Sequence, residues 1–144
     1  MPQGQFSLGR DIGLTIVTPQ LGRITLNTIT SFKSKSDDNV QKLILINGIT
    51  DHLRFFQGWS GSFDVERSSA ILDQYFAALE SDYFLGIPEA AASITETIQE
   101  VNGSVSQYRY PGVILSYADA GEFTGDKSVR QSMTFVSRRR VQIV

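Results

Sequence analysis

Alternating apolar and polar residues, the pattern of half-buried β-strands, recur along most of this chain of 144 residues. Only residues 69–86 follow another period. A chain with this pattern is restricted to a mainly β fold of about seven strands. The alternating runs are residues 12–17, 22–32, 40–46, 49–56, 93–101, 104–110, 113–119 and 127–144.

Two Asn-Gly pairs mark hairpin turns. The pairs Asn47-Gly48 and Asn102-Gly103 each lie between two alternating runs. Both central residues of a type I′ turn need positive φ angles, which Asn and Gly tolerate best. We therefore expect type I′ turns at both sites, and a further break in the chain at Pro111-Gly112.

Residues 69–86 have the period of a helix. Ser68 or Ser69 is suited to cap its N-terminus, and Gly86 is suited to end it before Pro88. We expect one α-helix over about residues 69–85. Its apolar stripe consists of Ile71, Leu72, Tyr75, Phe76, Leu79 and Tyr83.

The bulk composition is that of one globular domain. Hydrophobic residues make up 41% of the chain and charged residues 19%. The absence of cysteine excludes disulfides and thiolate metal sites. No apolar run approaches the roughly 20 residues of a membrane helix, and the first residues lack the features of a signal peptide. We expect a single domain over residues 1–144, with no membrane insertion and no export by the signal-peptide route.

Charge is segregated along the chain, although the net charge is only −2. Residues 64–100 carry eight acidic side chains and one basic one. Residues 1–63 carry six basic and four acidic side chains, and residues 101–144 carry six basic and three acidic ones. As surface patches, the acidic face of one copy could meet the basic face of another, or one sign of charge could line a cavity. A solvated acidic helix is the alternative.

Signatures of catalysis and cofactor binding are not found. His52 is the only histidine, and residues 58–62 (GWSGS) fall one glycine short of the G-x-S-x-G motif. Residues 121–128 (GEFTGDKS) resemble the end of a phosphate-binding loop, but Asp126 separates the glycine from the lysine. No acidic or histidine residues stand at metal-ligand spacing. We therefore expect no catalytic, cofactor-binding or metal-binding residues, and no enzyme activity.

Two short segments have structural interpretations. Gly58, Trp59 and Gly61 form a structural joint, in which the glycines permit a bulge or tight curvature of a strand. The Trp59 indole is expected to pack beside the neighbouring strand or the following helix. Residues 33–39 (KSKSDDN) contain no apolar residue, so they form a polar loop or a strand extension that reaches away from the core.

Residues 48–86 and 108–140 together resemble the tail tube proteins of tailed bacteriophages. The resemblance is to the short single-domain form found in contractile tails, which is related to the tube proteins of type VI secretion systems. Its most telling part is the order of Gly-Trp, Gly-Ser-Phe and a helix in residues 58–86. The Asp119-Ala120-Gly121 turn, the Gly125-Asp126 loop and a final strand rich in arginine complete it.

This resemblance implies an antiparallel β-sandwich or partly open barrel with one flanking α-helix. It also implies that six copies form a ring, that rings stack into a hollow tube, and that DNA passes through the tube during ejection without sequence-specific binding. The implied partners are the chain itself, in homohexameric rings, and the tail sheath, tape-measure and baseplate or tail-terminator proteins. The implied location is the virion tail, assembled in the cytoplasm of the host bacterium. No cofactor is implied.

Glu96 and Glu100 are the candidates to line the lumen of such a tube, because they share one face of a strand. Ile94 and Ile98 fall on the same parity, however, and favour a buried face unless a bulge intervenes. An N-terminal arm, residues 1–10, and the polar loop 33–39 are long enough to reach a neighbouring ring. The candidates for contacts between subunits or rings are Lys33, Lys35, Asp37, Asp38, Arg138, Arg139 and Arg140.

Two alternatives stay open. The first is the tube protein of a type VI secretion or other contractile injection system, whose lumen carries effector proteins. The second is a monomeric β-barrel binding module, with Trp59, Tyr108 and Tyr110 as its contact surface. Along a terminal strand, alternation would place Arg138 and Arg140 on one face and Arg139 on the other. We further expect these arginines to form salt bridges within or between subunits.

Overall fold

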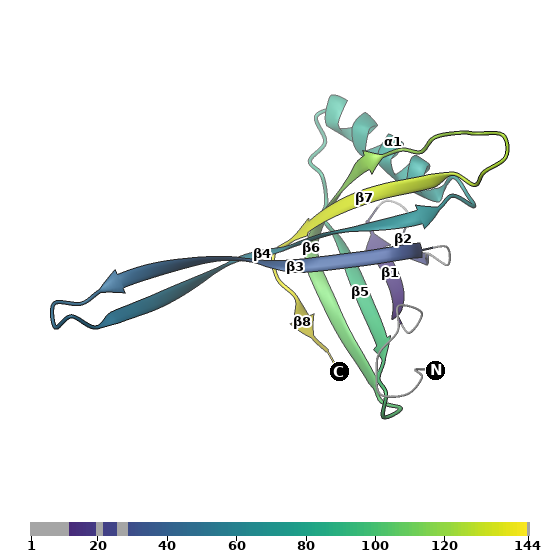
Figure 1. Ribbon diagram of the computed structural model, residues 1–144. Helices are drawn as coiled ribbons and strands as arrows, with labels where there is room; N and C mark the ends of the chain where they lie inside the picture. Colours follow the sequence, from purple (N-terminus) through teal and green to yellow (C-terminus); the bar gives the residue numbers. More distant parts are fainter. Residues whose placement is uncertain (1–11, 20–21, 26–28, 144) are drawn as a thin grey trace.

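The computed structural model describes residues 12–19, 22–25 and 29–143, which form eight β-strands and one α-helix (Figure 1). The predicted N-terminal arm, residues 1–10, lies outside the described residues. Within these ranges, no helix combines the length and the hydropathy of a membrane span. The elements are β1 (Ile12–Thr18), β2 (Gly22–Thr25), β3 (Ile29–Ile44), β4 (Thr50–Glu66), α1 (Ile71–Phe84), β5 (Ala92–Gln99), β6 (Val105–Asp119), β7 (Arg130–Ser137) and β8 (Val141–Gln142).

The strands form one antiparallel sheet that is open at both ends. Their order is β2-β1-β5-β6-β7-β4-β3, and the short β8 pairs with β6 beside this path. The outer strands β2 and β3 are therefore edges of the sheet, and the barrel is not closed. The predicted fold, a mainly β sandwich or partly open barrel with one flanking helix, is confirmed.

β6 belongs to both layers of the fold. Its residues 105–113 pair with β5, and its residues 114–119 pair with β7. Pro111 and Gly112, which were expected to separate two strands, lie where β6 changes its partner. One continuous strand thus connects the layer that contains β1 and β5 to the layer that contains β4 and β7.

Apolar side chains from both layers and from α1 form the core. Buried residues alternate with more exposed ones along β5 and β7, as the sequence pattern predicts. Phe135 of β7 stacks on Phe32 of β3 with ring centroids 5.7 Å apart. The Tyr110 ring of β6 packs edge-on against the Phe135 ring, with centroids 5.5 Å apart. The buried hydrophobic residues are Leu14, Ile16, Ile24, Phe63, Val65, Leu72, Tyr75, Ala92, Ile94, Tyr110, Val113, Leu115, Met133 and Phe135.

The helix α1 lies within the predicted range of residues 69–85. Ala70 takes the N-cap position, and no side chain caps the N-terminus. The expected capping by Ser68 or Ser69 is therefore wrong, because the helix begins later than either serine requires. Backbone hydrogen bonds of the Schellman type end the helix at Gly86, as predicted.

Asp73 fastens the first turn of α1 to the sheet. Its carboxylate accepts hydrogen bonds from the hydroxyl of Tyr117 on β6 (2.5 Å), the amide of Gln131 on β7 (3.0 Å) and the guanidinium of Arg67 (3.0 Å). The Tyr117 hydrogen bond is the largest effect that holds the pKa of Asp73 below its ordinary value, and burial raises the pKa of Tyr117. One carboxylate thus joins the helix to two strands.

Both Asn-Gly turns differ from the type I′ prediction. The Leu45 amide donates a hydrogen bond to the Ile49 carbonyl at 2.9 Å, so three residues rather than two form the loop. Gly48 has a φ angle of 83°, whereas Asn47 does not have a positive φ angle. The Asn47 side chain instead accepts a hydrogen bond from the Ile49 amide at 3.1 Å. The turn at Asn102-Gly103 repeats this arrangement.

Residues 33–39 are strand rather than loop. They lie within β3, which pairs with β4 on both sides of them. They pair with β4 through the backbone, and most of their polar side chains are exposed, so no apolar alternation is needed. The hydroxyl of the half-buried Ser34 forms a hydrogen bond with the Tyr110 hydroxyl at 3.2 Å. The run 22–32 is divided between β2 and β3, with residues 26–28 outside the described part, and the run 127–144 is divided between β7 and β8.

We predict that Asp73→Ala lowers the free energy of unfolding by about 2–3 kcal/mol, because three donors lose one charged acceptor. Urea denaturation at pH 7 measures this. Since the folded-state pKa of Asp73 is lowered, its contribution is present above the unfolded-state pKa and is lost as the pH falls. The difference between wild type and variant should therefore shrink below about pH 4.

The matched control is Glu80→Ala, which removes an exposed carboxylate from the same helix. It should change stability by no more than about 0.5 kcal/mol. Equal stabilities for the two variants would contradict the role assigned to Asp73.

Candidate functional site

The outer part of the β3–β4 hairpin stands away from the rest of the molecule (Figure 1). We call residues 38–56 the arm. Paired residues from Asp38↔Phe56 to Ile44↔Thr50 join its strands, over roughly 20–25 Å at about 3.3 Å per residue. Every residue of the arm is exposed except Leu43, which is half-buried. The arm is a two-stranded ribbon with solvent on both faces.

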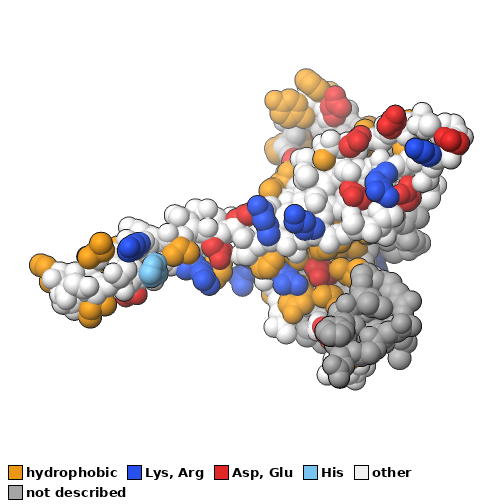
Figure 2. Space-filling model, in the orientation of Figure 1, with side chains coloured by type: hydrophobic (Ala, Val, Ile, Leu, Met, Phe, Trp, Pro, Cys, Tyr) orange, Lys and Arg blue, Asp and Glu red, His pale blue; other side chains and the backbone are white. Residues whose placement is uncertain are grey.

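Large apolar side chains cover much of the arm. Figure 2 shows them gathered at its free end, with Lys and Arg side chains closer to the body. Directly paired residues of antiparallel strands share a face, so Lys42 and Arg54 lie on the same face as Val40, Ile44 and Phe56. We call this the basic face. The exposed large apolar residues of the arm are Val40, Ile44, Leu45, Ile46, Ile49, Leu53, Phe55 and Phe56.

A bulge marks the root of the arm, at the predicted structural joint. The pairing of β3 and β4 shifts here, so that Asp37 lies opposite two residues of β4. A Cβ atom at Gly58 would lie 2.4 Å from the Ser137 carbonyl oxygen, and one at Gly61 would lie 2.2 Å from the Lys33 carbonyl oxygen. Glycine is therefore required for β4 to approach β3 and β7 this closely.

Trp59 packs with Arg140 beside this bulge. The Arg140 guanidinium lies 3.6 Å from the centroid of the Tyr108 ring and 5.0 Å from that of the Trp59 ring. Trp59 also meets the Tyr110 ring edge-on at 6.1 Å. The indole was expected to pack beside a strand or beside the helix, and it packs on the strand β6. The stack holds the segment after β7 against β4 and β6.

Glu96 is buried rather than exposed to a solvent-filled channel. Its exposed fraction is 5%, it accepts a hydrogen bond from the Tyr110 hydroxyl at 2.8 Å, and its Oε1 lies 3.7 Å from Arg140 Nη2. Burial raises the pKa of Tyr110 to about 12. Glu96 therefore faces the core together with Ile94, which has the same parity along β5. The expectation that Glu96 lines a lumen is wrong. Glu100 lies beyond the end of β5 and is half-buried.

The outward face of β5 carries hydroxyl groups in place of carboxylates. Ser93, Thr95 and Thr97 alternate with the buried residues of this strand. Thr97 pairs with Gln107 of β6, whose amide donates to the Thr97 hydroxyl at 3.3 Å, and Thr95 pairs with Arg109. This face is polar and contains no acidic residue on β5.

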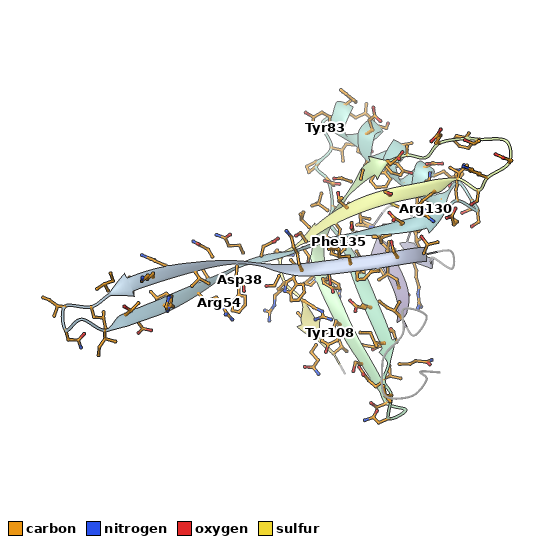
Figure 3. All side chains as sticks on the ribbon, viewed as in Figure 1. Asp38, Arg54, Tyr83, Tyr108, Arg130 and Phe135 are labelled. Atoms are coloured by element: carbon orange, nitrogen blue, oxygen red, sulfur yellow. The ribbon has the colours of Figure 1, made fainter. Side chains whose placement is uncertain are left out.

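The predicted contact residues on β3 gather near the root of the arm. Lys33 and Lys35 are exposed. Asp37 Oδ1 accepts a hydrogen bond from a serine of β4 at 3.2 Å. Asp38 lies 3.8 Å from Arg54 at the start of the arm, as Figure 3 illustrates. All four charged residues therefore lie on or beside the hairpin.

The three arginines after β7 do not alternate as predicted, because the strand ends at Ser137. The Ser137 hydroxyl lies 2.8 Å from the Pro111 carbonyl oxygen and 2.9 Å from that of Arg139, where the chain turns. Arg138 and Arg139 are exposed, whereas Arg140 is half-buried in the aromatic stack. Two of the three predicted contact arginines therefore lie on the surface of the chain.

A groove between α1 and β6 was not foreseen from the sequence. Its volume is about 430 Å³. Phe76, Leu79 and Tyr83 line the helix side, and Ile114 and Tyr117 line the β6 side. Phe76 packs on Tyr117 with ring centroids 4.1 Å apart, which forms the floor.

Acidic residues surround this groove, and apolar residues continue beyond it. Glu80, Asp82 and Glu89 contribute to its lining. Residues 83–87 (YFLGI) carry four large apolar side chains that are exposed. The signal in the sequence was this apolar run, which extends past the predicted helix end without the polar residues of an ordinary surface loop.

The described residues contain no cluster of metal ligands. No group of three or more His, Asp or Glu side chains there is arranged to hold a metal ion. His52 is exposed on the arm, where it pairs with Lys42. The candidate functional surfaces are therefore the arm and the α1–β6 groove.

No protein-family model matches the sequence, and no curated protein matches it. Several solved structures contain chains of similar fold. A chain of the anti-feeding prophage cap (AFP tube terminating cap) has a TM-score of 0.69 and 9% identity, covering 100% of this chain and 95% of that chain. A chain of the sheath/tube terminator of the extracellular contractile injection system PVC has a TM-score of 0.61 and 10% identity, covering 100% and 98%. A chain of the native gene transfer agent virion has a TM-score of 0.54 and 11% identity, covering 96% and 100%. These TM-scores establish a common fold.

We predict that Gly61→Ala lowers the free energy of unfolding by about 2–4 kcal/mol, because the added methyl would meet a backbone carbonyl of β3 and the Phe135 ring. Gly125→Ala is the matched control, since a Cβ there has nothing within 4 Å. It should alter stability by at most about 0.5 kcal/mol. Chemical denaturation of both variants measures the difference, and a Gly61→Ala protein as stable as its control would refute the packing described for this joint.

Proposed function

We propose that this chain is a structural subunit that forms hexameric rings, which stack into the tube of a phage tail or a related contractile device. The observation that carries the proposal is the arm, a ribbon whose large apolar side chains are mostly exposed to solvent. Chains from such particles have a similar fold, and this similarity also supports the proposal.

The arm is not suited to an isolated protein. A two-stranded hairpin is marginally stable in water by itself. Exposed apolar ribbons with unpaired edges also invite association. Ile44 and Phe56 are each 74% exposed on this ribbon. A regular assembly of identical copies would cover these surfaces repeatedly and in one defined way.

The open sheet supports a ring. β2 and β3 end the sheet at opposite edges, and closure around a symmetry axis is one way to protect such edges. In this proposal, the hydroxyl-rich outward face of β5 and β6 lines the lumen in place of Glu96. Threonine, serine and glutamine side chains make up most of this face, and Arg109 is the one charged residue that β5 and β6 contribute to it. One arginine per copy would present only a sparse positive charge to DNA phosphates during passage.

The tail sheath, the tape-measure protein and the baseplate or terminator proteins are the partners that this function requires. Assembly would take place in the cytoplasm of the host bacterium, and the product would reside in the virion tail. A type VI secretion or other contractile injection tube, which carries proteins in place of DNA, would use the same subunit architecture.

A terminator subunit at the end of the tube is the second candidate. It is favoured by the TM-score of 0.69 for a chain from the AFP tube terminating cap, against 0.56 for a chain from the PVC sheath-tube complex. Chains from the PVC sheath/tube terminator and from the AFP baseplate both have a TM-score of 0.61. A terminator would form rings that do not stack upon one another.

We predict that the purified chain forms particles roughly 80–100 Å wide in negative-stain electron microscopy, the width estimated for six such domains around a channel. Light scattering should give a mass that is a multiple of 16.0 kDa. Long tubes would support the tube subunit, and single rings of constant height would support the terminator. A monomer at every concentration, also in the presence of preformed tail tubes, would contradict both.

A further inference from the structure

The apolar surfaces of the arm and of the groove both lie open to solvent. Ile44 on the arm is 74% exposed, and Tyr83 at the groove is 76% exposed. Figure 3 places Tyr83 at one end of α1 and Arg54 out on the arm, far from one another. The arm therefore cannot fill the groove of its own chain. Exposed apolar patches of this kind mark interaction sites.

The two surfaces are complementary in charge. On the basic face of the arm, Lys42 and Arg54 accompany apolar side chains, and Asp38, which lies 3.8 Å from Arg54, is the one acidic residue of this face. Lys42 has no ion pair among the described residues. At the groove, Glu80 and Glu89 accompany an apolar floor. No ion pair joins either glutamate to another described residue. An apolar centre with opposite charges at its rim is the composition of a specific protein interface.

We propose that the arm of one copy of this chain docks, by its basic face, in the α1–β6 groove of a second copy. The inference rests on the proposed function, and it assigns a contact by which the copies assemble. A second copy is the occupant because each chain supplies one arm and one groove. Head-to-tail repetition then covers every arm and every groove without another protein, and it closes into a ring or continues as a filament.

Cross-linking tests this contact directly, because the chain contains no cysteine. One preparation carries Ile44→Cys and another carries Ile87→Cys, at positions that are 74% and 51% exposed. The two are mixed and oxidised with diamide. The control partner is Phe123→Cys, which is 74% exposed on the loop between β6 and β7.

We expect about tenfold more mixed dimer with Ile87→Cys than with Phe123→Cys, since docking raises the local concentration of the first thiol pair. Equal yields with the two partners would overturn the docking.

Charge reversal provides an independent test. The variant Lys42→Glu/Arg54→Glu should weaken self-association by about tenfold or more in sedimentation, because like charges would then face one another. The groove variant Glu80→Lys/Glu89→Lys should do the same. A chain that carries both sets of changes should recover most of the wild-type association.

The matched control combines the arm reversal with Glu122→Lys/Asp126→Lys, which makes the same change of net charge on an exposed loop. This chain should stay impaired. Equal recovery in the control would assign the effect to net charge and overturn the docking.

The docking and the proposed function fail in different ways. Wild-type rings or tubes in micrographs, with equal cross-linking at positions 87 and 123, would overturn the docking and leave the assembly standing. A monomeric wild-type chain without cross-links would overturn both. If the Ile87→Cys thiol becomes protected only when a different tail protein is added, the groove belongs to that protein and the docking is wrong.

Discussion

The pairing of β4 on both sides governs the shape of this molecule. From Trp59 to Val65, β4 pairs with β3 on one edge and with β7 on the other, so its apolar side chains are held in the core. β7 ends at Ser137, where the chain turns toward Pro111, and beyond this point β4 has one neighbour only. The bulge at Gly58 lies at this boundary. The arm is what remains of the hairpin once the second partner and the core have ended, which explains why its apolar residues are uncovered.

The sequence specifies the parts of the fold in which burial follows a single period. This group consists of the strands β1, β5 and β7, the helix, and the structural joint at Gly58, Trp59 and Gly61, because one face of each meets the core. Residues 33–39 were predicted as a polar loop or a strand extension, and the sequence could not decide between the two because no apolar residue alternates there. The continuity of β6 through Pro111 and the three-residue turns depend on tertiary pairing and on side-chain hydrogen bonds, which local residue preferences do not contain.

The candidate surfaces were foreseen to a smaller extent, and for a similar reason. Lys33, Lys35 and the neighbouring aspartates were placed near a projecting segment because of their polarity. The arm beyond them was expected to be an ordinary hairpin, since alternation does not reveal whether a core exists for the apolar face. The groove arises from the packing of α1 on β6, two segments separated by more than a strand in the sequence, so only the folded chain brings Tyr83 and Ile114 together.

The segregated charge of the sequence becomes meaningful once internal pairs are taken into account. Within the acidic segment 64–100, Glu66 pairs with Arg130, Asp73 with Arg67 and Glu96 with Arg140. These acids hold elements of one chain together and contribute little net field outside it. Glu80 and Glu89 have no such ion pairs among the described residues, so part of the acidity that reaches solvent lies beside the apolar groove. Among the residues that the structure describes, folding therefore leaves Glu80 and Glu89 beside the groove without an ion pair, and the same chain carries Lys42 without an ion pair on the arm.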